Sequence, residues 1–108
     1  MAKVVFSNEA SDQLKLLPAA IVGRMDKLVA RLESWPNLSG VKHLKGNLAG
    51  KHRLRTGDYR MQFRVEQTKR LIKANRSVKG RVVVVEEEVV EYRVIVEKVG
   101  HRDGFYEE

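Results

Sequence analysis

The apolar residues between positions 19 and 35 recur in steps of four and three, which is the spacing of one face of an α-helix. A shorter helix is expected before it, in the stretch EASDQLKLL, because Ser7 and Asn8 offer N-cap oxygens and Pro18 ends the pattern. The opening KVVF is a candidate strand. These segments predict a helical hairpin with one apolar face, which needs a sheet to cover it.

The segments KHRLR and YRMQFRVE alternate apolar and polar residues with a period of two, as half-buried strands do. Two turns can join them. A three-residue loop would pair Arg55 with Tyr59, whereas a two-residue turn at Gly57-Asp58 pairs Arg55 with Arg60. Only the second keeps the apolar residues of both strands on one face, because a slip of one residue inverts a strand. Gly57 suits that turn in its type II′ form.

The long stretch after these strands predicts one extended hairpin, with its turn at Lys79-Gly80 and its distal half beyond the core. This turn gives the cross-strand pairs Tyr59–Gly100, Phe63–Val96, Glu66–Arg93 and Lys73–Glu86. Opposite charges and apolar residues meet in these pairs, as cross-strand pairing favours. A rival interpretation makes TKRLIKANR a helical insertion.

The elements together predict a single α+β domain over residues 1–108. An N-terminal strand and a two-helix hairpin pack on a twisted, mainly antiparallel β-sheet, whose third and fourth strands form the extended hairpin. With 108 residues the chain is long enough for one modest core.

The net charge of +7 changes the functional picture, because so basic a small domain favours a polyanionic partner. The chain has no cysteine, and its three histidines lack the spacing of a helical metal pair, so neither a metal nor another cofactor is expected. No apolar run is long enough for a signal peptide or a membrane span. A cytoplasmic location without membrane contact is therefore expected.

The predicted register gathers cationic side chains on one face of the sheet: Lys51, Arg53, Arg55, Arg60 and Arg64. Val99 would pair with Arg60, so the segment GHRDGFY leaves the sheet beside that arginine. The tail is thus expected to bring His101, Arg102 and Tyr106 onto the basic face. Arginines in such an arrangement suit a phosphate backbone, because each guanidinium offers two parallel donors.

One reaction fits a basic face without metal ligands or paired carboxylates: metal-independent cleavage of RNA, in which the ribose 2′-OH attacks the adjacent phosphate. It needs a base, cations around the phosphate and an acid for the leaving oxygen. The candidates are Tyr106 and Lys51 as bases, Arg60 and Arg53 for the phosphate, and Arg102 or His101 for the leaving oxygen. Further candidates for binding the RNA are Lys45, Arg55 and Arg64. His101 has a structural alternative, in which it fixes the strand exit by hydrogen bonding.

The pieces HLKGNLAGKHRLRTGDYRMQFRV and VGHRDGFY, with FSNEASDQLKLLP before them, make the chain resemble the RelE/ParE superfamily of bacterial toxins from type II toxin–antitoxin pairs. The RelE-like branch implies an mRNA interferase, an endoribonuclease that cuts mRNA in the ribosomal A site. The residues that match this branch by position are Lys51, Arg53, Arg60, Arg102 and Tyr106. Arg53 stands where some members have lysine, and the stretch around residues 67–91 is longer than usual.

The resemblance also implies partners. They are the ribosome, mRNA and a cognate antitoxin, of which an acidic or amphipathic segment would cover the basic face. Two alternatives stay open: a ParE-like inhibitor of DNA gyrase without nuclease activity, and a non-catalytic RNA-binding relic.

Overall fold

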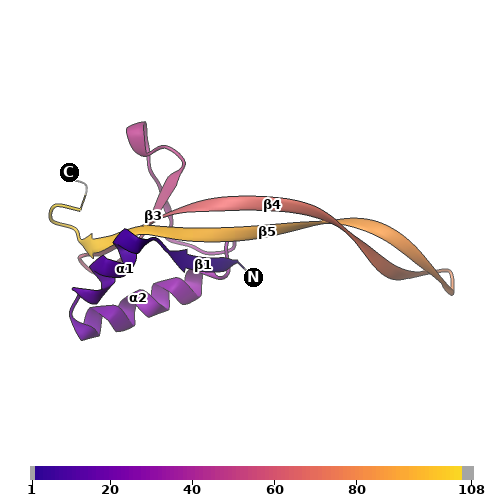
Figure 1. Ribbon diagram of the computed structural model, residues 1–108, viewed down its shortest axis with the longest axis horizontal. Coiled ribbons are helices and arrows are strands. Elements are labelled where there is room, and N and C mark those ends of the chain that lie inside the picture. Colours follow the sequence, from indigo (N-terminus) through magenta and orange to yellow (C-terminus); the bar gives the residue numbers. More distant parts are fainter. Residues whose placement is uncertain (1, 106–108) are drawn as a thin grey trace.

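The computed structural model describes residues 2–105 and shows two helices on one face of a five-stranded sheet, from which a long two-stranded arm projects (Figure 1). The strand order is β1-β5-β4-β3-β2. The elements are β1 (Lys3–Phe6), α1 (Asn8–Lys15), α2 (Ala19–Leu32), β2 (Lys42–His43), the 3₁₀ turn η1 (Gly46–Leu48), β3 (Lys51–Thr56), β4 (Tyr59–Val78) and β5 (Arg81–His101).

Both predicted helices are present. The Ser7 hydroxyl caps α1 by accepting a hydrogen bond from the Ala10 N–H at 3.1 Å. The second helix ends at Leu32, three residues before the predicted end at Trp35, and the chain continues through short turns to a cis peptide bond at Trp35-Pro36. Within residues 2–105, neither helix has the length and apolarity that crossing a bilayer requires.

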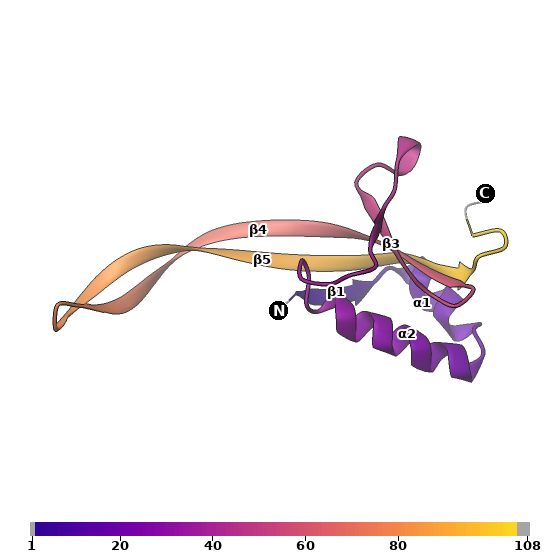
Figure 2. The ribbon, with the colours of Figure 1, turned by 180° about the vertical axis from the view of Figure 1, so that it is seen from behind.

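The core lies between the helices and the sheet. Its fully buried large side chains come from α2 and from the three central strands: Met25, Leu32, Leu54, Met61, Phe63, Val94 and Val96. Trp35 packs against this cluster from its edge, as the helical stripe predicts. The segment before β3, which contains η1, rises on the opposite side of the sheet from the helices (Figure 2). One sheet face is therefore covered by helices and the other is not.

The register of β3 and β4 confirms the two-residue turn, because Arg55 pairs with Arg60. Gly57 has φ 58°, and no positive φ is found at Asp58, which is the pattern of a type II′ turn. Leu54 pairs with Met61, and both are buried under the helices.

The extended hairpin is also present. β4 and β5 stay paired without interruption from Phe63–Val96 to the tip at Val78–Arg81, so the helical alternative for TKRLIKANR is wrong. We call residues 67–91 the arm. It lengthens the molecule to 61 Å, against 32 and 25 Å in the other two directions.

A β-bulge shifts the register near the base of this hairpin. Gln62 pairs with Lys98 and Phe63 with Val96, so Glu97 is the extra residue on β5. The predicted pairs Phe63–Val96, Glu66–Arg93 and Lys73–Glu86 are observed. Below the bulge the prediction is wrong by one residue. Tyr59 pairs with His101 rather than with Gly100, and Gly100 takes the predicted place of Val99 opposite Arg60.

The predicted fold class is corrected in two details. The sheet is mixed, because β1 runs parallel to β5, and it has five strands, because Lys42–His43 adds a short strand beside β3. The extended hairpin is accordingly formed by the fourth and fifth strands. The short strand escaped prediction because two residues are too few to show an alternating pattern. The parallel pairing escaped prediction because β1 and its partner lie about ninety residues apart along the chain, as the pair Lys3–Arg93 shows.

Candidate functional site

Cationic side chains occupy the sheet face that the helices leave open. Residues opposite one another in neighbouring strands share a face. Three cross-strand rows result: Lys51–Arg64–Ile95, Lys42–Arg53–Gln62–Lys98 and Arg55–Arg60–Gly100. We call these residues, together with Glu97 in the bulge, the outer face.

The residues at the base of the outer face are buried. Ile95 is 7% exposed and Gln62 is 6% exposed, although no helix covers them. Long cationic side chains bury neighbouring surface with their aliphatic stems, which accounts for this burial. The outer face therefore presents charged groups above a partly apolar, well-packed base.

Glu97 is the carboxylate within this set of cations. One of its oxygens lies 3.2 Å from Lys51 Nζ and the other lies 3.5 Å from Arg64 Nε. Arg64 also pairs with Glu66 at 3.3 Å. The row farthest from the turn is thus largely neutralised.

The middle of the outer face is not neutralised. Arg53 Nε is buried and finds no hydrogen-bond acceptor within residues 2–105. A buried donor without an acceptor costs free energy, so this atom would gain from an anionic or carbonyl partner. Arg55, on the same strand, is exposed and makes no ion pair with any described residue.

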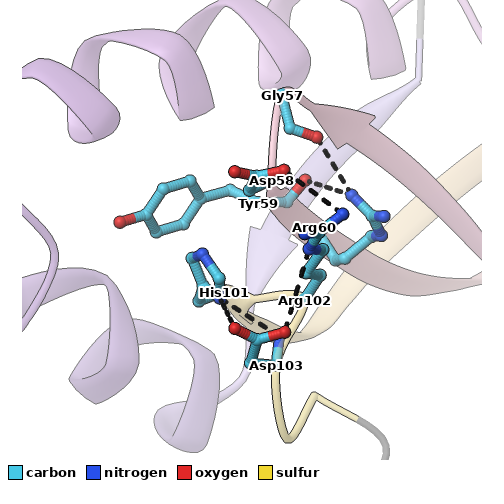
Figure 3. A network of polar contacts seen from close by, with 7 residues as sticks. All are labelled: Gly57, Asp58, Tyr59, Arg60, His101, Arg102 and Asp103. Carbon is cyan, nitrogen blue, oxygen red and sulfur yellow. Dashed lines mark hydrogen bonds and ion pairs between the residues drawn. The ribbon is translucent and has the colours of Figure 1, made fainter.

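At the turn end of the outer face, Arg60 and Arg102 both contact the β3–β4 turn (Figure 3). Arg60 Nη1 donates to the carbonyl of Gly57 at 3.1 Å. The Arg102 N–H donates to the carbonyl of Asp58 at 2.6 Å, and its Nη1 lies 3.6 Å from the Asp58 carboxylate. The two arginines are therefore held near each other by the turn.

His101 lies on the other side of the sheet from Arg60. Its ring meets Tyr59 edge to face at 5.2 Å between centroids, and Tyr59 packs on the core (Figure 3). Its Nδ1 accepts a hydrogen bond from the Asp103 N–H at 3.1 Å, which fixes the strand exit. The prediction that the tail brings His101 onto the basic face is wrong, because the bulge turns this position towards the helices.

The tail itself does fold back over the outer face. Phe105 is 3% exposed and packs over Gly100, and Lys98 Nζ lies 4.8 Å from the centre of its ring. Tyr106, the predicted base, lies outside the described residues.

The remaining predicted site residues are spread along the sheet. Lys51 and Arg55 are four positions apart on β3, a separation of roughly 13 Å between their Cα atoms. Lys45 precedes η1 in the segment that rises beside the sheet, and it is exposed. Their assigned roles in catalysis and RNA binding stay predictions, because nothing in the structure tests them.

Sequence reasoning missed Lys42 and Lys98 as members of the outer face. Lys42 belongs to the two-residue strand that no pattern reveals. Lys98 had a signal: without the bulge it would face Met61 under the helices, while Val99 would face Arg60. A lysine in the core and a valine among arginines would have indicated the shift.

Two of the three histidines form a pair on the side of β3 opposite the outer face. His43 and His52 face each other across β2 and β3, with their Nδ1 atoms 2.7 Å apart. Burial lowers the pKa of His52 from its ordinary value, and the neighbouring His43 lowers it further. Among the described residues, no group of three or more histidine, aspartate or glutamate side chains is placed to hold a metal ion.

No family model matches the chain, and no curated protein matches it. Solved structures do match. A chain of the toxin–antitoxin complex RelBE2 from Mycobacterium tuberculosis is 24% identical, with a TM-score of 0.63 over 94% of this chain and 98% of that one. A chain of the RelB–RelE antitoxin–toxin complex from Methanococcus jannaschii is 20% identical, with a TM-score of 0.60 over 94% of both chains. What is shared is the fold.

This finding corrects the identification as a RelE-branch toxin. The similar structures are antitoxin–toxin complexes, and at these identities the likeness carries the fold and no toxin activity. The assignment to a ribosome-dependent mRNA-cutting toxin is therefore not supported, nor are its gyrase and RNA-binding alternatives. Whether the chain has any endoribonuclease activity stays an untested prediction.

Proposed function

We propose that this chain is one component of a toxin–antitoxin pair and that it binds the other component through the outer face. The likeness to chains of two such complexes supports a role in a toxin–antitoxin pair. The observation that carries the proposal is the charge of the outer face, where seven cationic side chains meet only the carboxylates of Glu97 and Glu66 among the described residues: Lys42, Lys51, Arg53, Arg55, Arg60, Arg64 and Lys98.

An acidic or amphipathic polypeptide segment fits this surface. Its carboxylates would meet the exposed guanidinium of Arg55 and the other cationic groups that make no ion pair on this face. Its apolar residues would lie along the aliphatic stems of the lysine and arginine side chains that cover Ile95. Binding of this kind relies on opposite charge for its rate and on a few desolvated contacts for its strength.

The ribosome and mRNA are not part of this proposal. They follow from the resemblance alone and stay predictions, because the likeness to antitoxin–toxin complexes supports a protein partner only.

The test is titration of the purified chain with the second protein of its pair, comparing Arg55→Glu with Arg70→Glu. Arg55 is exposed on the outer face, and Arg70 is exposed on the arm. Reversal of a charge in the interface should weaken binding by about tenfold or more, while reversal on the arm should leave it unchanged. Equal affinities for the two variants would show that the partner binds elsewhere.

A further inference from the structure

One edge of β5 is unpaired over most of its length. β1 covers only Arg93–Val96, and no described strand continues along that edge into the arm. An open strand edge is a template for pairing with another chain, and proteins usually shorten, bulge or interrupt it with proline. The segment RVVVVEEEVVEY of β5 has no proline and no bulge, its pairing with β4 is regular throughout, and charged side chains are the protection that it does carry.

A pocket lies where this free edge meets β1. It has a volume of about 480 Å³ and is lined by Lys3, Trp35, Val89, Val90, Glu91 and Tyr92. Aromatic and aliphatic walls with one charge of each sign suit an apolar side chain carried by a polar backbone. Lys3 is the first residue of β1, so a strand added along the arm would pass this pocket next to the start of β1.

We propose that the free edge of β5 binds an extended, basic segment of a partner protein, which adds to the sheet as a strand in line with β1 and anchors an apolar side chain in this pocket. Exposed valines flank the edge: Val82, Val84 and Val90 are 75%, 66% and 38% exposed. A strand laid beside β5 would cover part of them. This surface is separate from the outer face, so the inference does not depend on the proposed partner.

The charge of β5 selects a basic occupant rather than a second copy of the chain. A two-fold antiparallel pairing centred on Glu86–Glu88 would bring these carboxylates of one copy against those of the other, and like charges across strands repel. Glu88 and Glu91 already face Lys69 and Arg70 on β4, at 3.7 and 2.8 Å. Each carboxylate can still accept further donors from the opposite side.

The test uses two synthetic peptides of about ten residues, long enough to line the free edge. One alternates lysine with valine, and the other has glutamate at every lysine position. Trp35 is the only tryptophan and lines the pocket, so its fluorescence reports occupation directly. The basic peptide should change that emission saturably and slow amide exchange along β5 within the arm, whereas the acidic peptide, which the outer face can bind, should do neither.

Two matched variants locate the site. Val90→Arg places a charge in the pocket and should weaken binding of the basic peptide by about tenfold or more. Leu71→Arg introduces the same side chain on β4, where residue 71 is 67% exposed, and should have no effect. The proposal is overturned if neither peptide protects the β5 amides, if both protect them equally, or if these amides become protected with rising protein concentration alone, which would identify a second copy as the occupant.

Discussion

His52 sits in a small aromatic cluster, where its ring stacks against Trp35 and Phe63 at 5.1 and 5.4 Å between centroids. Its pKa is lowered from 6.5, first by burial and then by His43. The folded protein therefore prefers the neutral imidazole. The contact with His43 agrees with this preference, because two nitrogens 2.7 Å apart can share only one proton.

The lowered pKa of His52 makes stability depend on pH. Below pH 6.5 the unfolded chain binds a proton at this position more readily than the folded chain does. The contribution is therefore complete above that pH and is lost as the pH falls through the folded pKa. Melting temperatures should stay level between about pH 7.5 and 6.5 and decrease as the pH is lowered further.

The control for this pH dependence is His52→Phe, which keeps an aromatic ring against Trp35 and removes the titrating group. Its melting temperature should fall less over the same pH range than that of the unmodified chain. An identical fall in both proteins would assign the pH dependence to other groups.

At the scale of the elements, the β3–β4 turn depends on Gly57, whose φ of 58° is costly for residues with a branched side chain. A Cβ built there would meet Arg24 Nη1 at 3.6 Å, an ordinary contact, so any penalty is conformational. Gly57→Val should lower the free energy of unfolding by roughly 1–2 kcal/mol, measured by urea denaturation.

A second glycine supplies the matched comparison. Gly23 lies inside α2, and an added Cβ there meets nothing within 4 Å. Gly23→Ala should therefore raise the free energy of unfolding by roughly 0.5–1 kcal/mol. If Gly57→Val also proves neutral or stabilising, the turn has another conformation in solution.

The elements also show which parts of the fold could be predicted. Alternation of apolar and polar residues specified the register of β3 with β4, because a slip would move apolar side chains to the wrong face. The turn at Lys79-Gly80 and the matching of opposite charges across the strands specified the register of the arm. It did not specify the bulge at Glu97, which depends on one extra residue in an otherwise regular strand. That residue decides whether Val99 or Gly100 lies opposite Arg60 and on which face His101 lies, so the tail end of the candidate site was misplaced.

At the scale of the whole molecule, the chain is far from compact. Its radius of gyration is 18.1 Å, whereas a compact domain of this length has about 13 Å. The arm accounts for the difference, and none of its residues belongs to the core cluster or packs against it. An isolated two-stranded hairpin is only marginally stable in water, so the arm is expected to depend on charge pairs such as Arg76–Glu87 and on a partner.

Removal of the arm separates its role from that of the core. Gln67 pairs with Tyr92, so replacing residues 68–91 by Asn-Gly joins two facing positions through a favoured hairpin turn. The shortened chain should keep the helical part of its circular dichroism spectrum while losing strand signal, and should keep its free energy of unfolding to within about 1 kcal/mol, because no core contact is lost. It should no longer bind the basic peptide, and it should still bind the partner of the outer face. Failure of the shortened chain to fold would mean that the arm stabilises the core, and loss of both ligands from a folded chain would mean that the two surfaces form one interface.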